Sequence, residues 1–264
     1  MKRTIIRLQT FYKYKELFFQ LISRDIKLRY RRSFLGYLWS ILNPLLMMLV
    51  KILVFSNLFA RGIPNFPIYL ITGYIIFQFI TGSGSSSLYS IIGNAGLLKK
   101  IYIPKYIFTL ASITSEIVIF FFSLGALIIV ILVTGTPLTL RFFLLVIPII
   151  QLYVFCVGLG LFLAQAMVFF RDIQHLWNVF SSAWMFLSAI FYPVEILPDA
   201  LKHIIICYNP MYFYITMARN FIIGTVHDLG MTDLVIRGSI AAVLMLVIGF
   251  ISFTRNKNKF ILYI

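Results

Sequence analysis

The sequence predicts an all-α integral membrane protein with six transmembrane helices and both ends of the chain in the cytoplasm. Apolar residues make up 61% of the 264 residues and charged residues only 12%, against about 25% charged residues in a soluble domain. The apolar residues gather in about six long stretches. Lysine and arginine outnumber aspartate and glutamate by 23 to 8 and flank those stretches. The basic charge therefore indicates membrane topology rather than a nucleic-acid partner.

Each of the six stretches is long enough to cross a hydrocarbon core of ~30 Å, which takes about 20 helical residues. The apolar runs are continuous and do not alternate with polar positions, which argues against transmembrane strands. The expected spans cover residues 35–59, 66–92, 106–134, 142–170, 174–193 and 233–253.

The distribution of lysine and arginine predicts the orientation of these spans. If the N-terminus is cytoplasmic, 17 of the basic residues fall in cytoplasmic tails and loops, and 5 fall outside. Lys51 lies within a span and does not count for either side. The asymmetry predicts that both termini are cytoplasmic.

The first 33 residues form a separate cytoplasmic tail (1–33) ahead of the membrane domain (34–264). This tail is basic throughout and lacks the central apolar run of a cleavable signal peptide. Residues 11–31 show apolar side chains at helical spacing, with basic side chains on much of the remainder. The pattern predicts an amphipathic helix in the cytoplasmic interface, with its cations near anionic lipid head groups.

Two ionisable residues, Lys51 and Glu116, lie well inside the expected spans. They can pair with each other, line a wet lumen, or each satisfy a local polar group. An intramembrane charge is a functional-site hypothesis by default, and ion coupling is one such function. The sequence shows no internal repeat with paired broken helices of the kind found in secondary transporters.

The sequence contains no zinc-ligand spacing, no H-E-x-x-H, no G-x-S-x-G and no G-x-x-x-x-G-K-[ST] motif. We therefore predict no catalytic or metal site on this chain, and no ATP binding through a P-loop. If the protein works against a gradient, its energy must come from a partner subunit or from ion coupling.

Two cytoplasmic connections carry unusual residues. Residues 93–104 join two spans through one or two helical turns that combine apolar and basic side chains, and these can bury against the interface or against a partner protein. The residues concerned are Leu97, Leu98, Lys99, Lys100, Ile101, Tyr102 and Pro104. A second, very tight connection contains Arg171 and Asp172, which are expected to cap or anchor the two adjoining helix ends.

The outer region before the last span is broken. Two apolar half-length segments, 199–208 and 211–224, meet at Asn209–Pro210, and each is too short to cross the bilayer. We expect short re-entrant helices that dip into the outer leaflet, with their backbone buried against protein.

Five fragments in matching order carry a family resemblance that covers nearly the whole chain. They are R-D-I-K-L-R-Y-R-R-S-F-L-G-Y-L-W-S-I-L-N-P (24–44), L-L-K-K-I-Y-I-P-K (97–105), F-F-R-D-I (169–173), Y-P-V-E-I-L-P (192–198) and Y-N-P-M-Y (208–212). The ordered set resembles the membrane (permease) subunit of type-2 ABC transporters. Within that group it looks most like the polysaccharide, O-antigen and teichoic-acid exporters.

The resemblance implies a homodimer in the bacterial cytoplasmic (inner) membrane, with a channel at the subunit interface. Two copies of a separate cytoplasmic subunit would hold ATP and Mg, with no cofactor on this chain. The substrate would be an undecaprenyl-linked glycan or polyol phosphate moved outward. The segment matching Leu97–Pro104 would be the coupling helix that docks on the ATPase. The alternative is an ion-coupled secondary transporter or a non-transporting membrane protein.

A sugar polymer calls for a channel wall that is neither charged nor uniformly apolar. Aromatic faces stack on sugar C–H surfaces, while amides and hydroxyls exchange hydrogen bonds with sugar hydroxyls. Possible lining residues are Tyr37, Trp39, Asn43, Gln78, Trp177, Asn178 and Ser181. The small polar run 81–87 has two interpretations, channel lining or close helix packing in lipid.

Overall fold

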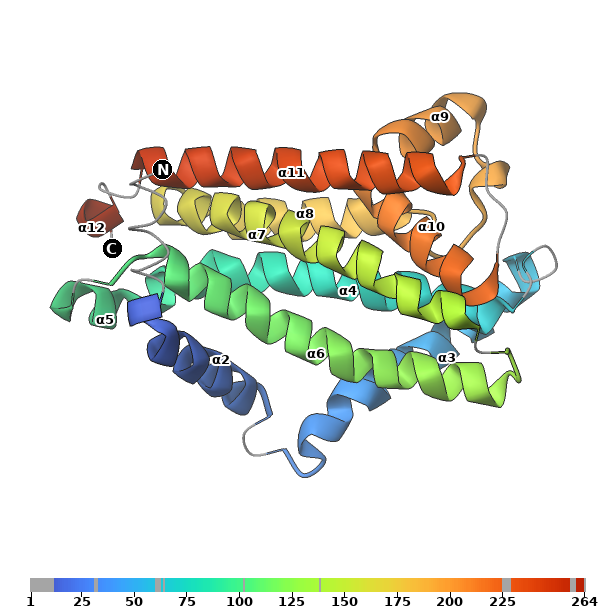
Figure 1. Cartoon of the computed structure of the whole chain (residues 1–264), viewed down its shortest axis with the longest axis horizontal. Coiled ribbons are helices and arrows are strands. Elements are labelled where there is room, and N and C mark those ends of the chain that lie inside the picture. The colour runs from blue at the N-terminus through green and yellow to red at the C-terminus, as the bar shows by residue number, and fades with distance from the viewer. Residues whose placement is uncertain are drawn as a thin grey trace.

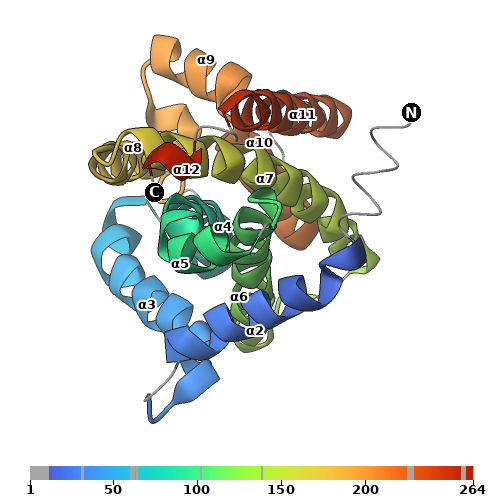
Figure 2. The ribbon, with the colours of Figure 1, turned by 90° about the vertical axis from the view of Figure 1, so that its left-hand side faces the viewer.

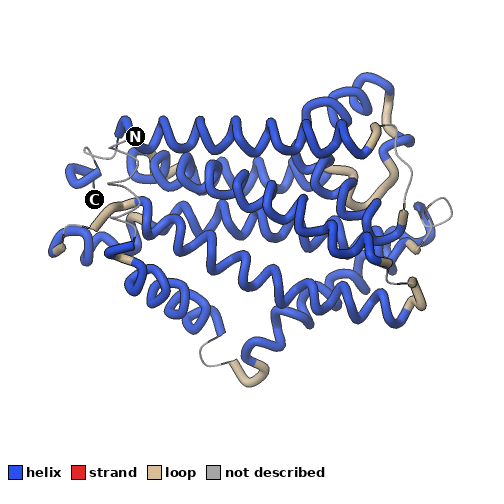
Figure 3. The backbone as a smooth tube through the Cα atoms, viewed as in Figure 1, coloured by secondary structure: helices blue, strands red, loops and turns tan. Residues whose placement is uncertain are grey.

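The computed structural model describes residues 12–30, 33–59, 63, 65–101, 103–137, 139–224, 229–256 and 260–263. Helices dominate this part of the chain, and it contains no strand (Figure 3). The longer elements are α2 (Lys15–Tyr30), α3 (Trp39–Phe59), α4 (Phe66–Ser90), α6 (Tyr106–Val133), α7 (Val146–Phe169), α8 (Ile173–Phe186), α9 (Asp199–Tyr208), α10 (Pro210–Ile223) and α11 (Met231–Asn256). The shorter ones are η1 (Gly36–Leu38), η3 (Ile92–Asn94), α5 (Ala95–Lys100), η4 (Leu140–Leu145), η5 (Val194–Ile196) and α12 (Phe260–Tyr263).

The long helices form a bundle with two distinct ends. Helices α2, α5 and α12 lie at one end, and α9 and α10 lie towards the other (Figure 1). Viewed from the α5 end, α4 occupies the middle of the bundle (Figure 2). Burial agrees with this position, because 78% of the residues in the most apolar part of α4 are buried, against 17–44% in the other long apolar helices. The membrane-facing surface is therefore supplied mostly by the helices around α4.

Five helical segments among the described residues are long and apolar enough to cross a membrane. They are Gly36–Phe55, Phe66–Ser90, Tyr106–Val133, Leu140–Phe169 and Met231–Asn256. These segments match five of the six expected spans, so the integral membrane class is confirmed at this level. The number of spans, the side of the termini and the re-entrant arrangement stay predictions.

The remaining expected span, 174–193, has a different form. Its helix α8 has only 14 residues, which is about 21 Å at helical rise and less than a ~30 Å hydrocarbon core. Residues 187–193 continue in turns rather than as helix. The sequence could not place this stop, because apolar residues continue past it.

Close contact between α7 and α11 depends on two glycines. A Cβ atom on Gly249 would overlap the carbonyl oxygen of Gly158, and a Cβ on Gly158 would overlap the backbone at Met245. Small residues allow helix backbones to approach in lipid, where packing rather than the hydrophobic effect drives association. The same principle applies to Gly84, whose missing side chain leaves room for the ring of Trp177.

A second buried cluster joins the elements at the α5 end of the bundle. It contains side chains from α2, α5, α6, α7, α11 and α12, and α12 also packs its Phe260 and Tyr263 against Phe169. The buried members are Leu21, Ile22, Ile91, Leu98, Ile103, Ile107, Phe108, Ala111, Leu161, Ala164, Val168, Phe253 and Phe260. The apolar side of α2 is therefore packed against the bundle, as its amphipathic pattern requires.

Candidate functional site

A cavity of about 290 Å³ with both polar and apolar walls lies between α3, α4 and α6, with one residue of α2 at its edge. It brings together three of the predicted lining residues, Trp39, Asn43 and Gln78, and the intramembrane carboxylate Glu116. The full lining is Arg29, Trp39, Ser40, Asn43, Pro44, Tyr74, Ile75, Gln78, Phe79, Gly82, Glu116, Ile119, Phe120 and Ser123. Ligand pockets typically measure about 300–1,000 Å³, so the cavity has room for a short stretch of a ligand.

The start of α3 is shaped by Gly36 and Pro44. Gly36 has a φ of +50°, a conformation that glycine adopts without steric cost. Pro44 lies inside the helix and has no N–H to give to the carbonyl of Ser40 one turn earlier. The hydroxyl of Ser123 in α6 donates a hydrogen bond to that carbonyl at 3.1 Å. This bond fixes the first turns of α3, and hence Trp39 and Asn43, against α6.

Gln78 is the exposed residue within the otherwise buried stretch 68–80 of α4. Its side-chain amide donates a hydrogen bond to the hydroxyl of Tyr74. The ammonium of Lys51 in α3 lies 3.3 Å from the centroid of the Tyr74 ring and 5.0 Å from that of Phe191. Lys51 therefore faces aromatic rings rather than Glu116, with which it would pair in one of the sequence-based alternatives.

Glu116 pairs with an arginine from the N-terminal tail. Both carboxylate oxygens accept hydrogen bonds from Arg29 of α2, one at 3.1 Å and one shorter. Glu116 is 5% exposed and the Arg29 side chain is 43% exposed. Gly82 of α4 makes room for the carboxylate, because a Cβ there would lie 2.8 Å from Glu116 Oε2. The ion pair attaches the end of α2 to α6.

The predicted lining residues of α8 lie apart from this cavity. Trp177 is buried against Gly84, and its indole N–H donates to the Ser85 hydroxyl at 3.1 Å. Asn178 is exposed and Ser181 half-buried. These contacts support the packing interpretation for residues 84 and 85, and a lining role for Asn178 and Ser181 stays a prediction.

Tyr37 also lies apart from the 290 Å³ cavity. It is 47% exposed, and its ring stacks on Phe122 with 6.2 Å between centroids. Arg171 and Asp172 are exposed in the turn before α8. The Asp172 side chain forms no capping hydrogen bond with that helix, and the role of both residues as anchors stays a prediction.

The connection between α4 and α6 contains the expected short helix, α5. Leu98 is buried in the cluster at that end, and Leu97 packs partly against it. Lys99 and Lys100 are exposed, and Ile101 is 54% exposed.

Pro104, at the end of this connection, is half-buried, and Tyr102 lies outside the described residues. One side of α5 therefore anchors the helix, and the other presents two cations and an isoleucine outward.

Sequence reasoning assigned no role to Arg219, which lies within the half-length segment 211–224. Arg219 in α10 is 3% exposed. Its guanidinium donates to the backbone carbonyls of Tyr69 at 3.1 Å, Ala189 at 3.1 Å and Ile190 at 3.0 Å. It also lies 3.3 Å from the centroid of the Tyr69 ring. Gly73 leaves space for it, since a Cβ there would lie 2.8 Å from Nη2.

Asn209, at the break between α9 and α10, supports the turn that follows α8. Its amide donates to the Leu187 carbonyl at 2.8 Å, and its Oδ1 accepts from Trp184 Nε1 at 2.9 Å and Met211 N at 3.0 Å. The last bond caps the start of α10. Together, Arg219 and Asn209 satisfy carbonyls that the early end of α8 leaves without helical partners, as buried backbone requires. An Asn-Pro pair after a short apolar segment is the sequence signal for this cap.

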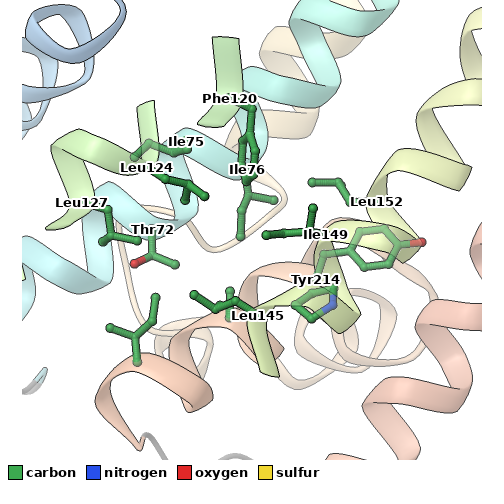
Figure 4. Close-up of a pocket in the computed structure, with 13 residues that line it drawn as sticks. Thr72, Ile75, Ile76, Phe120, Leu124, Leu127, Leu145, Ile149, Leu152 and Tyr214 are labelled. Atoms are coloured by element: carbon green, nitrogen blue, oxygen red, sulfur yellow. The ribbon is translucent and has the colours of Figure 1, made fainter. Parts of the chain in front are cut away.

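A second cavity lies between α4, α6, α7 and α10 (Figure 4). Its volume is only about 20 Å³, and apolar side chains such as Ile76, Leu124 and Leu152 surround it. This space holds about one water molecule, and its lining offers little hydrogen bonding to a sugar. The 290 Å³ cavity is therefore the better candidate for substrate contact.

Comparison with known proteins gives consistent matches. The family described as ABC-2 type transporter matches residues 16–223. The chain is 28% identical over 248 residues, 93% of each chain, to the O-antigen export system permease protein RfbA of Klebsiella pneumoniae. It is 31% identical over 204 residues to the protein of the same name from Myxococcus xanthus, covering 76% of this chain and 77% of that one. It is 25% identical over 202 residues to the polysialic acid transport protein KpsM of Escherichia coli, covering 75% and 78%.

Proposed function

The chain belongs to the ABC-2 type transporter membrane family, and we propose that it is the permease subunit of an exporter of lipid-linked surface polysaccharide. It is a multi-pass protein of the cytoplasmic membrane, as its apolar helices and its relatives indicate. The observation that carries the proposal is similarity across 93% of the chain to a permease named for O-antigen export. The secondary-transporter alternative is not favoured, because the relatives above are named as export permeases or polysaccharide transport proteins.

The 290 Å³ cavity supports a sugar-containing substrate. It combines an indole and a phenol ring with two amide side chains, from Trp39, Tyr74, Asn43 and Gln78. Rings of this kind pack on the apolar faces of sugars, and amides both donate and accept hydrogen bonds. We propose that this cavity contacts part of the glycan during export. An O-antigen-type chain fits the relatives' names best, and a teichoic acid with a polyol phosphate backbone is the second candidate.

The energy source we propose is a separate cytoplasmic ATPase with its own ATP and Mg, present in two copies on a homodimer of this chain. Helix α5 suits the docking role, because Leu98 anchors it while Lys99, Lys100 and Ile101 face outward. An exposed cluster of two cations and an apolar side chain matches an acidic, partly apolar groove on a partner. The undecaprenyl-type carrier would remain in the lipid while the glycan is moved.

The test is co-purification and coupled ATP hydrolysis with a P-loop ATPase subunit from the same organism. Charge reversal at Lys99 and Lys100 should weaken the complex and lower ATP-dependent export. Leu98→Pro should do the same by breaking α5. The matched control is Arg141→Glu, an exposed cation in η4, at the end of the bundle away from α5. If the α5 variants bind the ATPase and export as well as the control does, the docking assignment is wrong.

A further inference from the structure

Glu116 is an unusual group for the interior of a membrane-spanning helix. It is 5% exposed, and it borders the 290 Å³ cavity on the α6 side. A buried carboxylate is strongly unfavourable unless it is paired and hydrogen-bonded. In this structure the pairing comes from Arg29, whose guanidinium donates to both carboxylate oxygens.

Arg29 is placed so that it can leave. Its side chain is 43% exposed, while that of Glu116 is 5% exposed, so water can solvate the guanidinium without much rearrangement. Arg29 belongs to α2, which lies outside the central bundle (Figure 2). Its side chain borders the cavity and contacts Glu116 there. Farther back on α2, Arg24 donates to Asn94 Oδ1 at 2.8 Å, directly before α5. The helix that carries Arg29 is thus connected to the segment proposed to receive the ATPase.

If Arg29 withdraws, Glu116 needs other donors. An ionised carboxylate accepts hydrogen bonds at about four lone-pair positions and donates none. Sugar hydroxyls are donors of the required kind, and hydrogen bonds to a charged acceptor are stronger than neutral ones. The surrounding Trp39, Asn43 and Gln78 offer the ring and amide contacts that a sugar ring needs beside the carboxylate.

We propose that Glu116 is a glycan-binding residue that Arg29 masks: hydroxyl groups of the exported chain replace the guanidinium at the carboxylate when the glycan enters the cavity. The inference rests on the proposed function and adds a specific contact to it. Arg29 acts as a positioning residue, and the exchange keeps Glu116 hydrogen-bonded in both states. Each departure of sugar returns Arg29 to the carboxylate, so Glu116 has hydrogen-bond donors throughout a transport step.

If Arg29 masks Glu116, substitutions of these two residues change the apparent KM for glycan in opposite directions. The measurement is ATP hydrolysis by the reconstituted complex as a function of lipid-linked polysaccharide, extracted from cells in which this gene is deleted. Glu116→Gln removes the charged acceptor and should raise the apparent KM about tenfold, the usual effect of weakening one charge-assisted hydrogen bond. Arg29→Gln removes the competitor and should lower the apparent KM several-fold.

The double variant provides the sharpest outcome. In the Glu116→Gln background, Arg29→Gln should leave the apparent KM unchanged, because a mask without a charged acceptor has nothing to cover. Lys27→Gln, on an exposed position of the same helix, and Asp233→Asn, an exposed acid of α11, are the matched controls. A purely structural ion pair predicts instead that both single variants lower thermal stability and leave the apparent KM unaltered. That result, or equal shifts of KM in the same direction, overturns the proposal.

Failure of this inference can be separated from failure of the proposed function. If the wild-type complex shows ATP hydrolysis stimulated by the polysaccharide while the variants behave like their controls, only the role of Glu116 is refuted. If the wild-type chain neither binds an ATPase nor responds to the polysaccharide, the proposed function itself fails.

Discussion

Replacing Arg219 tests whether the turn after α8 is held by side chains rather than by its own backbone. The variant Arg219→Met keeps much of the side-chain volume and removes three hydrogen bonds to backbone carbonyls, at 3.0–3.1 Å. Side-chain hydrogen bonds within membrane proteins average about 0.6 kcal/mol and reach about 1.7 kcal/mol. The charged guanidinium donor places each bond above that average, at about 1 kcal/mol, so the three bonds together contribute about 3 kcal/mol.

The carbonyls differ in the hydrogen-bond donors that remain after the substitution. The Ala189 carbonyl still accepts from the Tyr69 hydroxyl at 3.2 Å, while the Ile190 carbonyl loses the donor supplied by Arg219. For a protein of 150–250 residues, 1 kcal/mol corresponds to about 2–4 °C in Tm. We therefore expect a fall of about 6–12 °C in the melting temperature, and Arg219→Lys should recover less than half of it because an ammonium lacks the planar fork.

The assay is thermal unfolding of the detergent-purified protein, followed by size-exclusion chromatography of the fraction that stays monodisperse. Arg237→Met is the control, since Arg237 donates one long hydrogen bond of 3.4 Å to the Cys207 carbonyl. We expect the control to shift Tm by no more than about 2 °C. Equal melting temperatures for the two methionine variants would refute the reasoning.

Three further predictions concern the bundle and the cavity wall. Gly249→Val should force α7 and α11 apart and abolish the monodisperse peak in size-exclusion chromatography. Gly93→Ala should leave the peak intact, because a Cβ at Gly93 meets nothing within 4 Å. A normal peak for the valine variant contradicts the packing argument. Lys51→Met should lower stability by at most about 2 kcal/mol, the range of a desolvated cation–π contact, measured as a Tm shift; an unchanged Tm would show that the contact is not stabilising. Ser123→Ala should lower the free energy of unfolding by about 1 kcal/mol in the wild type. The loss should be smaller in a Pro44→Ala background, where an N–H returns to the helix. Additive losses in the double variant argue against the idea that Ser123 replaces the missing N–H of Pro44.

The helical segments were largely predictable because their signals are local. The half-length segments 199–208 and 211–224 correspond to α9 (Asp199–Tyr208) and α10 (Pro210–Ile223), and every end agrees within one residue. Asn209 and Pro210 mark that boundary, because asparagine is favoured at the N-cap of a helix and proline at its first position. The end of α8 was not predictable, because it depends on Arg219 reaching a turn 29–30 residues earlier in the chain.

Three of the seven expected lining residues lie in one cavity, but the ion pair beside them was not predictable. Trp39, Asn43 and Gln78 were selected by sugar-binding chemistry, and the fold brings them to one cavity. The partner of Glu116 was not among the alternatives, since Arg29 is 87 residues away in the chain. Its proximity follows from the way α2 folds back against α6, and neither the periodicity of α2 nor the charge count contains that information.

The most direct test of the account is export by the reconstituted chain with and without its ATPase subunit. Purified protein is placed in vesicles loaded with lipid-linked polysaccharide on the face that carries α5, and the polysaccharide reaching the other face is measured. We expect no ATP hydrolysis and no export by this chain alone, and ATP-dependent export once the ATPase subunit and Mg are added. Export driven by a proton or sodium gradient without the ATPase would contradict it.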